Sequence, residues 1–230
     1  NGKAEGKADM RNLLGGKGAN LAEMNLIGVP VPPGFTITTD VCNEYFEKGK
    51  EAVVEALTSE VTKSVKHIED LMNSKFGDPS NPLLVSVRSG ARASMPGMMD
   101  TILNLGLNDD VVEGLARKTG NERFAYDSYR RFVQMYGDVV LGMKPENKED
   151  IDPFEAIIQR VKAKRNIKLD NEMNVADLKE LVLEFKKAIK SQTGKEFPSN
   201  PMEQLWGAIC AVFTSWMNER AILYRKMEGI

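Results

Sequence analysis

The chain has 230 residues, of which 42% are hydrophobic and 28% charged, and its formal net charge is -2 at pH 7. This is an ordinary globular composition, and a net charge so close to zero argues against nucleic acid or an anionic membrane surface as a partner. No apolar stretch approaches the roughly 18 residues that a membrane-spanning helix needs. Two cysteines and one histidine exclude a disulfide framework and a Cys/His zinc site made within this chain.

The first part of the chain carries helix signals around a rigid connector. A glycine turn at residues 15–18 opens a helix that Gly28 ends, and the proline-rich residues 29–34 predict an extended connector. Apolar side chains then keep a helical period over residues 53–72. We therefore expect two helical segments joined by a stiff, extended stretch.

Strand signals are interspersed with these helices. Residues 35–38 predict a short strand, and residues 101–105 predict another. Residues 83–87 are apolar at most positions, which indicates a strand buried on both faces. The first part of the chain is therefore expected to be mixed α and β.

From about Asn108 the pattern becomes entirely helical. Helix starts are indicated by side chains that can accept hydrogen bonds from the first free N–H groups, at Asn121, Asp152, Asn174 and Asn200. The far end of the chain, up to Ile230, keeps a helical pattern with no tail, so we expect the polypeptide to continue beyond it.

The first residues of the chain lack the apolar core of a signal peptide.

The first candidate for chemistry is the sequence Gly15-Gly16-Lys17-Gly18 at a helix start. Main-chain N–H groups and the positive end of a helix attract anions, and the lysine adds a positive charge. It is not a Walker A loop, since Gly18 stands where Ser or Thr is required. The pattern is compatible with a phosphate site, but as a bare pattern it favours a plain glycine-rich helix entry that carries an exposed lysine.

The second candidate is Arg88, which ends the predicted strand at residues 83–87. A loop of small residues follows, and no acidic residue lies between Leu83 and Met99. Arginine suits phosphate binding because its planar guanidinium can hold two oxygens together. The alternative is a hairpin-like loop in which Arg88 forms a structural ion pair.

Methionines cluster in the same loop, at Met95, Met98 and Met99. Methionine commonly fills gaps in a core, but the neighbouring Pro96 and Gly97 are typical of a loop that covers a ligand or closes as a lid. Both interpretations stay open from the pattern alone. His67, Cys42 and Cys210 lie within helical patterns and are interpreted as structural.

These stretches carry a family resemblance. The chain resembles the N-terminal part of the pyruvate, phosphate dikinases in four stretches, residues 12–24, 33–39, 84–106 and 123–132. The loop at residues 90–100 is the most specific match. The resemblance implies an α+β fold, part of an ATP-grasp nucleotide-binding domain that holds ATP with magnesium. In the family, a phosphoryl group passes to a histidine on a swivelling domain, and pyruvate becomes phosphoenolpyruvate while ATP and phosphate yield AMP and diphosphate.

The resemblance also implies roles for individual residues. Lys17 and Arg88 match the family's ATP-phosphate contacts, and the loop over the phosphates corresponds to Gly97, Met98, Met99, Asp100 and Thr101. We expect this loop to be mobile without nucleotide and to order over ATP. The family's metal-binding carboxylates and phosphohistidine match nothing in this chain, so no catalytic or metal-binding residue is assigned and the chain alone is expected to be inactive in the full reaction.

The resemblance further implies a discontinuous architecture. Residues 1–108 and 196–230 are expected to form an α/β ATP-grasp subdomain, and residues 109–195 a helical insertion. The expected partners are ATP and the phosphohistidine domain of the same polypeptide, and neither nucleic acid nor a membrane is expected to bind. The full-length enzyme is expected to form a homodimer through a domain absent here and to be cytoplasmic. The alternatives are a phosphoenolpyruvate synthase, a related dikinase or a non-catalytic ATP-grasp-like module.

Overall fold

The computed structural model describes residues 3–145, 147 and 149–229. Contacts divide the chain into two compact units. Unit 1 comprises Asn1–Asn73, Arg88–Thr101 and Ile209–Ile230, and unit 2 comprises Ser74–Val87 and Ile102–Ala208. Within the described ranges, no helix combines the length and the apolar character needed to cross a membrane.

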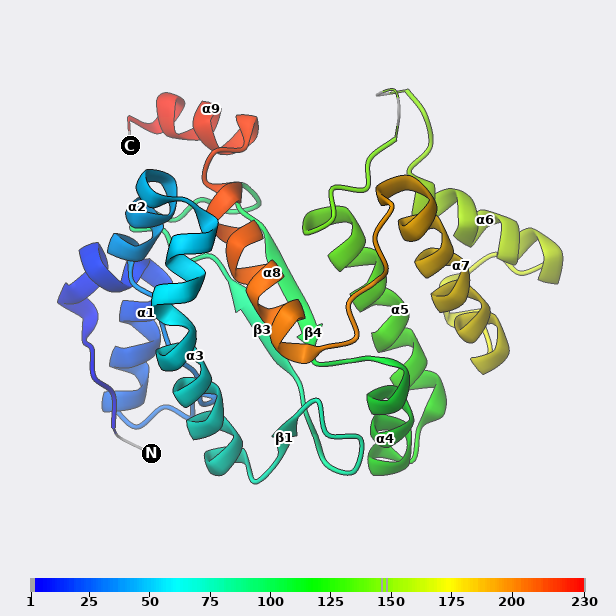
Figure 1. Ribbon diagram of the computed structural model, residues 1–230, viewed down its shortest axis with the longest axis horizontal. Coiled ribbons are helices and arrows are strands. Elements are labelled where there is room, and N and C mark those ends of the chain that lie inside the picture. The colour runs from blue at the N-terminus through cyan, green and yellow to red at the C-terminus, as the bar shows by residue number, and fades with distance from the viewer. Residues whose placement is uncertain (1–2, 146, 148, 230) are drawn as a thin grey trace. The chain divides into compact units, whose positions relative to one another are not determined.

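Unit 1 is built from helices around a small apolar core. Its elements are a 3-10 turn η1 (Ala8–Met10) and the helices α1 (Arg11–Leu26), α2 (Thr39–Lys48), α3 (Lys50–Met72) and α9 (Glu219–Glu228), together with the end of α8 (Pro201–Ser215) (Figure 1). Helix α3 buries the apolar face that its sequence period predicts, at Val53, Val61, Val65 and Ile68. The ring of Tyr45 on α2 packs 5.3 Å from that of Phe213, centroid to centroid.

One predicted strand in unit 1 is wrong. Residues 35–38 form no strand, although the β-branched Thr36, Ile37 and Thr38 favour extended backbone. A strand also needs a hydrogen-bonded neighbour, and here Thr36 instead packs its side chain against Gly18. The β-branched residues indicate only a local preference for extended backbone, and this preference does not determine whether a second strand pairs with the segment.

Unit 2 contains the strands. Strands β1 (Lys75–Phe76) and β2 (Pro82–Leu83) pair in parallel, with Lys75 opposite Pro82. Strands β3 (Val85–Arg88) and β4 (Thr101–Leu105) form a second two-stranded sheet, with their ends at Arg88 and Thr101 lying in unit 1 (Figure 1).

The predicted strand at residues 83–87 is corrected in two respects. It is divided between β2 and β3, and β3 is not buried on both faces, because Ser86 and Arg88 are exposed. The strand alternates half-buried and exposed side chains, which is typical of a sheet with one covered face. The strand predicted at residues 101–105 is confirmed as β4.

Four of the helices in unit 2 begin where the sequence predicts, after Asn121, Asp152, Asn174 and Asn200. The helices of this unit are α4 (Asp109–Thr119), α5 (Glu122–Val139), α6 (Pro153–Arg165) and α7 (Val175–Thr193), with a 3-10 turn η2 (Asp170–Glu172) and the first part of α8. The Asp152 carboxylate accepts hydrogen bonds from the N–H groups of Phe154 and Glu155 at 2.9 and 3.0 Å. Side chains of Asn121, Asn174 and Asn200 cap their helices in the same way.

Aromatic and apolar side chains fill the core of unit 2. Helix α5 packs against α4 and α7 (Figure 1). The rings of Phe154 and Phe185 meet edge to face at 4.9 Å. Gln204 is fully buried, accepting from the Gly106 N–H at 2.9 Å and donating to the carbonyls of Leu107 and Pro198 at 2.9 and 2.8 Å.

The observed elements confirm the α+β class expected from the sequence. Within residues 109–195, the regular elements that the structure describes are helices and no strand occurs among them. The compact units are bounded differently from the expected subdomains, since unit 2 also takes in Ser74–Val87 and the rest of β4. The division into residues 1–108 with 196–230 and residues 109–195 stays a prediction, because compactness alone does not define an inserted subdomain.

Candidate functional site

The predicted glycine turn and the loop after Arg88 touch within unit 1. A Cβ atom on Gly15 would lie 1.3 Å from the main-chain oxygen of Gly90, and Gly15 has a φ of 68°, which L side chains rarely adopt. The N–H of Gly16 donates a hydrogen bond of 2.9 Å to the carbonyl oxygen of Ala91. The two candidate segments are therefore fixed against each other through their main chains.

Gly15 also sets where the helix effectively starts. Its ψ of 170° lies outside the helical range and kinks α1, so the regular helix runs from Gly16 onward. A Cβ on Gly18 would lie 3.0 Å from Thr36 Oγ1, and Thr39 Oγ1 donates to the carbonyl of Asn12 at 2.5 Å. The threonines that follow the proline-rich connector thus pack around this helix start.

Lys17 presents a positive charge at this helix start. Its side chain is exposed and makes no hydrogen bond or ion pair with any residue in the described part of the chain. The helix dipole adds positive potential at the same end. This arrangement is compatible with anion binding and agrees equally with the simpler interpretation of an exposed lysine at a helix entry.

Arg88 is the last residue of β3, and its side chain lies on the exposed side of that strand. The chain then enters the loop whose main chain at Gly90 and Ala91 contacts the glycine turn. Short main-chain distances therefore link the segment that bears Lys17 to the segment that bears Arg88. Two cationic side chains on joined segments can serve one anionic ligand, provided both side chains turn toward it.

The predicted covering loop, residues 97–101, starts with a turn. The N–H of Met98 donates to the Met95 carbonyl at 3.2 Å, and Gly97 adopts a φ of 74°. Met95 is buried, with 9% of its surface exposed, whereas Met98 and Met99 are half-buried. Core filling therefore accounts for Met95, while Met98 and Met99 keep surface that a ligand can contact.

Sequence reasoning missed the residues that hold this loop. Arg220 at the start of α9 donates from Nε to the Met98 carbonyl at 3.1 Å and pairs with the Asp100 carboxylate. Asn218 Nδ2 donates to Asp100 Oδ2 at 3.3 Å, and the Asp100 N–H donates to Ser215 Oγ at 3.2 Å. These partners lie more than a hundred positions from the loop in sequence, so no local spacing could have indicated them.

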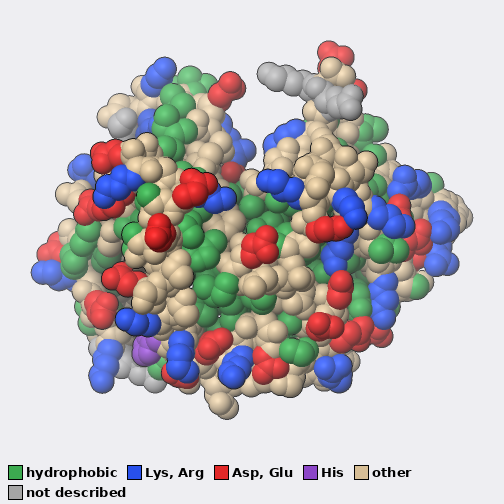
Figure 2. Space-filling model, in the orientation of Figure 1, with side chains coloured by type: hydrophobic (Ala, Val, Ile, Leu, Met, Phe, Trp, Pro, Cys, Tyr) green, Lys and Arg blue, Asp and Glu red, His purple; other side chains and the backbone are tan. Residues whose placement is uncertain are grey.

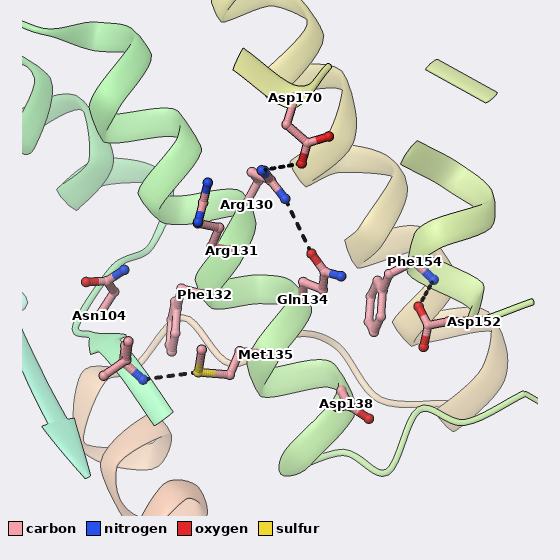
Figure 3. Close-up of a pocket in the computed structure, with 11 residues that line it drawn as sticks. Asn104, Arg130, Arg131, Phe132, Gln134, Met135, Asp138, Asp152, Phe154 and Asp170 are labelled. Carbon is pink, nitrogen blue, oxygen red and sulfur yellow. Dashed lines mark hydrogen bonds and ion pairs between the residues drawn. The ribbon is translucent and has the colours of Figure 1, made fainter. Parts of the chain in front are cut away.

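A separate cavity of about 490 Å³ lies in unit 2, and none of its lining residues belongs to the predicted site. Arg130 on α5 donates to Asp170 Oδ2 at 3.1 Å and also donates to Gln134 Oε1. Figure 3 shows both contacts at the edge of this cavity. Arg130 Nε and Arg131 Nε each lie 3.0 Å from a different oxygen of Asp127. The arginines that line the cavity are thus neutralised by neighbouring carboxylates, which leaves little attraction for an anionic ligand.

Charged groups around Asp170 lower the pKa of its carboxyl. The largest cause is the hydrogen bond from Lys162, with a further contribution from Arg130, and partial burial opposes both. This ion cluster joins η2 to α5 and α6. Its role is structural, because each charge already has a partner.

The remaining candidates for chemistry carry no site. Among residues 3–145, 147 and 149–229, no group of three or more His, Cys, Asp or Glu side chains gathers to hold a metal ion. His67 is exposed on α3, and burial raises the pKa of the thiols of Cys42 and Cys210. Figure 2 shows acidic and basic side chains interspersed over the face in view, without a broad patch of one sign.

Comparison with known proteins supplies the family. The family described as "Pyruvate phosphate dikinase, AMP/ATP-binding domain" matches residues 11–63 and 50–230. The chain belongs to this family. It is 55% identical over 227 residues to the pyruvate, phosphate dikinase of Clostridium symbiosum, 52% over 229 residues to that of Rhizobium meliloti, and 53% over 229 residues to a chloroplastic one of Mesembryanthemum crystallinum.

These matches cover nearly all of this chain and a small part of each relative. They span 98% to 100% of the chain but 25%, 25% and 23% of the three relatives. The chain therefore corresponds to about a quarter of a pyruvate, phosphate dikinase. The family resemblance expected from the glycine turn and the loop after Arg88 is confirmed over the whole length.

Proposed function

We propose that this chain is the N-terminal, ATP-binding part of a pyruvate, phosphate dikinase, in which Lys17 and Arg88 contact the phosphates of ATP. The contact of Gly15 and Gly16 with Gly90 and Ala91 carries the proposal. It joins the segments of the two candidate cations, which are far apart in sequence. Membership of a family described by its AMP/ATP-binding domain supports the same ligand.

The chemistry of the two side chains suits phosphoryl transfer. The transferred group spreads negative charge over its oxygens in the transition state, and cations already in place stabilise that charge without rearrangement. Arg88 holds two oxygens with its planar guanidinium, and Lys17 supplies a point charge at the positive end of a helix. In this proposal the loop of Gly97, Met98, Met99, Asp100 and Thr101 covers the phosphates and excludes water.

The larger architecture is part of the proposal. Units 1 and 2 contribute to an incomplete ATP-grasp domain, and the missing part follows in the longer polypeptide. The short coverage of the relatives supports this, since the matches span about a quarter of them. The phosphoryl group is then passed to a histidine on a swivelling domain of the same polypeptide, and dimerisation uses a domain outside this chain.

Magnesium accompanies ATP in this proposal, but the residues described here do not fit a magnesium site. Magnesium is held by carboxylates, and the carboxylate of the covering loop, Asp100, is already bound by Arg220 and Asn218. We therefore assign its protein ligands to the part of the polypeptide outside this chain. The cytoplasmic location also stays a prediction, and the plant relatives are named chloroplastic.

The acceptor of the second phosphoryl group tests the proposed reaction. We expect the full-length polypeptide, given pyruvate, ATP and phosphate, to form phosphoenolpyruvate, AMP and diphosphate only when phosphate is present. Formation of phosphoenolpyruvate without phosphate, with water as acceptor, would instead indicate a phosphoenolpyruvate synthase. Absence of phosphoenolpyruvate, AMP and diphosphate in both assays would indicate a non-catalytic module.

A further inference from the structure

Arg220 makes two different contacts with the covering loop. Its Nε donates to the main-chain carbonyl of Met98 at 3.1 Å, and its Nη2 forms an ion pair with Oδ1 of Asp100. One planar guanidinium thus binds both the main chain and a side chain of the loop. This geometry needs the fork of an arginine, since a lysine offers a single nitrogen.

The loop is anchored on the same side by two further groups. Asn218 Nδ2 donates to Asp100 Oδ2 at 3.3 Å, and the Asp100 N–H donates to Ser215 Oγ at 3.2 Å. Ser215 is 1% exposed, and its hydroxyl donates to the Val212 carbonyl at 2.7 Å, which fixes the direction of its lone pairs. The Asp100 end of the loop is therefore attached to a buried helix end.

Helix stability does not explain an arginine at this position. Arg220 lies in the first turn of α9, where the helix dipole is positive and a cation is unfavourable. The Asp100 side chain is 18% exposed, and its carboxylate supplies the negative charge that offsets this cost. The contact with the loop accounts for the arginine better than its own helix does.

The residue at the other end of the loop is conformationally permissive. Gly97 has a φ of 74°, and a Cβ added there would meet no atom within 4 Å. Glycine rotates readily between positive and negative φ, so Gly97 can act as a hinge while Asp100 is held. The loop therefore has one permissive end and one anchored end.

We propose that Arg220 is a positioning residue for ATP: through Met98 and Asp100, it holds the loop at residues 97–101 ready to cover the phosphates. This rests on the proposed function, in which that loop covers the ATP phosphates. A loop that is already anchored at one end costs less to immobilise when the ligand binds. Arg220 itself touches the loop and acts through it.

The test compares variants of the full-length polypeptide. Arg220→Gln removes the charge and the fork, Arg220→Lys keeps the charge alone, and Lys226→Gln removes an exposed charge elsewhere on α9 as the matched control. Hydrogen exchange of peptides that cover residues 97–101 is measured without nucleotide. Single-turnover phosphorylation from ATP then gives the apparent ATP dissociation constant and the rate at saturation separately.

We expect Arg220→Gln to speed exchange of the loop and to weaken ATP binding, each roughly tenfold, because charge-assisted hydrogen bonds to the loop are lost. The rate at saturating ATP should change much less, since binding then restores the loop. Arg220→Lys should fall between wild type and Arg220→Gln, and Lys226→Gln should match wild type. A general folding defect in a variant would instead lower the amplitude of phosphorylation at every ATP concentration, because less of the polypeptide would be active.

Two results would overturn the proposal. One is loop exchange in Arg220→Gln that equals the Lys226→Gln control. The other is faster loop exchange with unchanged ATP affinity. Failure of the proposed function looks different, since the wild-type polypeptide itself would then show no phosphorylation from ATP.

Discussion

The carbonyl oxygen of Gly90 occupies the space that a Cβ atom on residue 15 would need, 1.3 Å away. This contact excludes every side chain at residue 15, because the obstructing atom belongs to the main chain. It also means that the glycine turn and the loop after Arg88 hold their relative position only while residue 15 is glycine. Two substitutions separate this steric effect from backbone strain.

Gly15→Ala should destabilise the chain more than Gly28→Ala does. Both positions have positive φ, 68° and 89°, but a Cβ on Gly28 would meet nothing within 4 Å. Strain at such a φ costs about 1–3 kcal/mol, and displacing the Gly90 main chain adds roughly a further 1–3 kcal/mol. Urea unfolding of the purified chain measures the difference, and equal losses for the two variants would contradict the contact.

Asp170→Asn should lower stability in a pH-dependent manner. Lys162 and Arg130 depress the pKa of Asp170 below that of an aspartate in an unfolded chain, so its carboxylate stabilises the fold at any pH above that ordinary pKa. This contribution is lost as the pH falls through the depressed pKa. We expect Asp170→Asn to cost about 1 kcal/mol at pH 7, because 44% of the side chain is exposed and water screens the pair.

The measurement is the free energy of unfolding of Asp170→Asn and wild type between pH 7 and pH 2. The two curves should approach each other as the pH falls, because the Asp170 carboxylate of the wild type is then progressively protonated. Glu60→Gln, at an exposed position on α3, serves as the control for loss of a carboxylate. A difference between Asp170→Asn and wild type that stays constant over the whole pH range would show that the ion cluster contributes nothing.

The chain of 230 residues should not form phosphoenolpyruvate by itself. The described residues offer no cluster of metal ligands, and the single histidine lies exposed within helix α3. The purified chain, incubated with pyruvate, ATP, magnesium and phosphate, is assayed for AMP and phosphoenolpyruvate, with the full-length polypeptide as positive control. Turnover by the isolated chain would show that the missing domains are not required.

Local signals in the sequence predicted what local physics determines. The side chains of Asn121 and Asp152 cap their helices because an N-cap depends on residues only two or three positions away. The predicted strand at residues 35–38 failed because pairing depends on a partner elsewhere in the chain. Sequence pattern therefore located helices better than sheet pairing.

Local sequence likewise indicates some residues of the candidate site and misses others. The glycine-rich surroundings of Lys17 and Arg88 indicate both residues in the sequence, and the contact between Gly16 and Ala91 joins their segments. No local pattern indicates Arg220, because its partner Asp100 lies 120 positions away. Only the folded chain brings these two residues together.

Single-turnover phosphorylation of the full-length polypeptide from ATP tests the central claim most directly. Lys17→Ala and Arg88→Ala should each slow the reaction by roughly 10²–10³, or about 2.7–4 kcal/mol, as expected for the loss of one preorganised group that stabilises charge. Arg88→Lys should recover only part of the rate, because an ammonium group keeps the charge but lacks the planar pair of donors that holds two oxygens in a fixed geometry. Lys63→Ala, at an exposed lysine on α3, should react like wild type. Near-normal rates in Lys17→Ala and Arg88→Ala would contradict the assignment of these residues to the ATP phosphates.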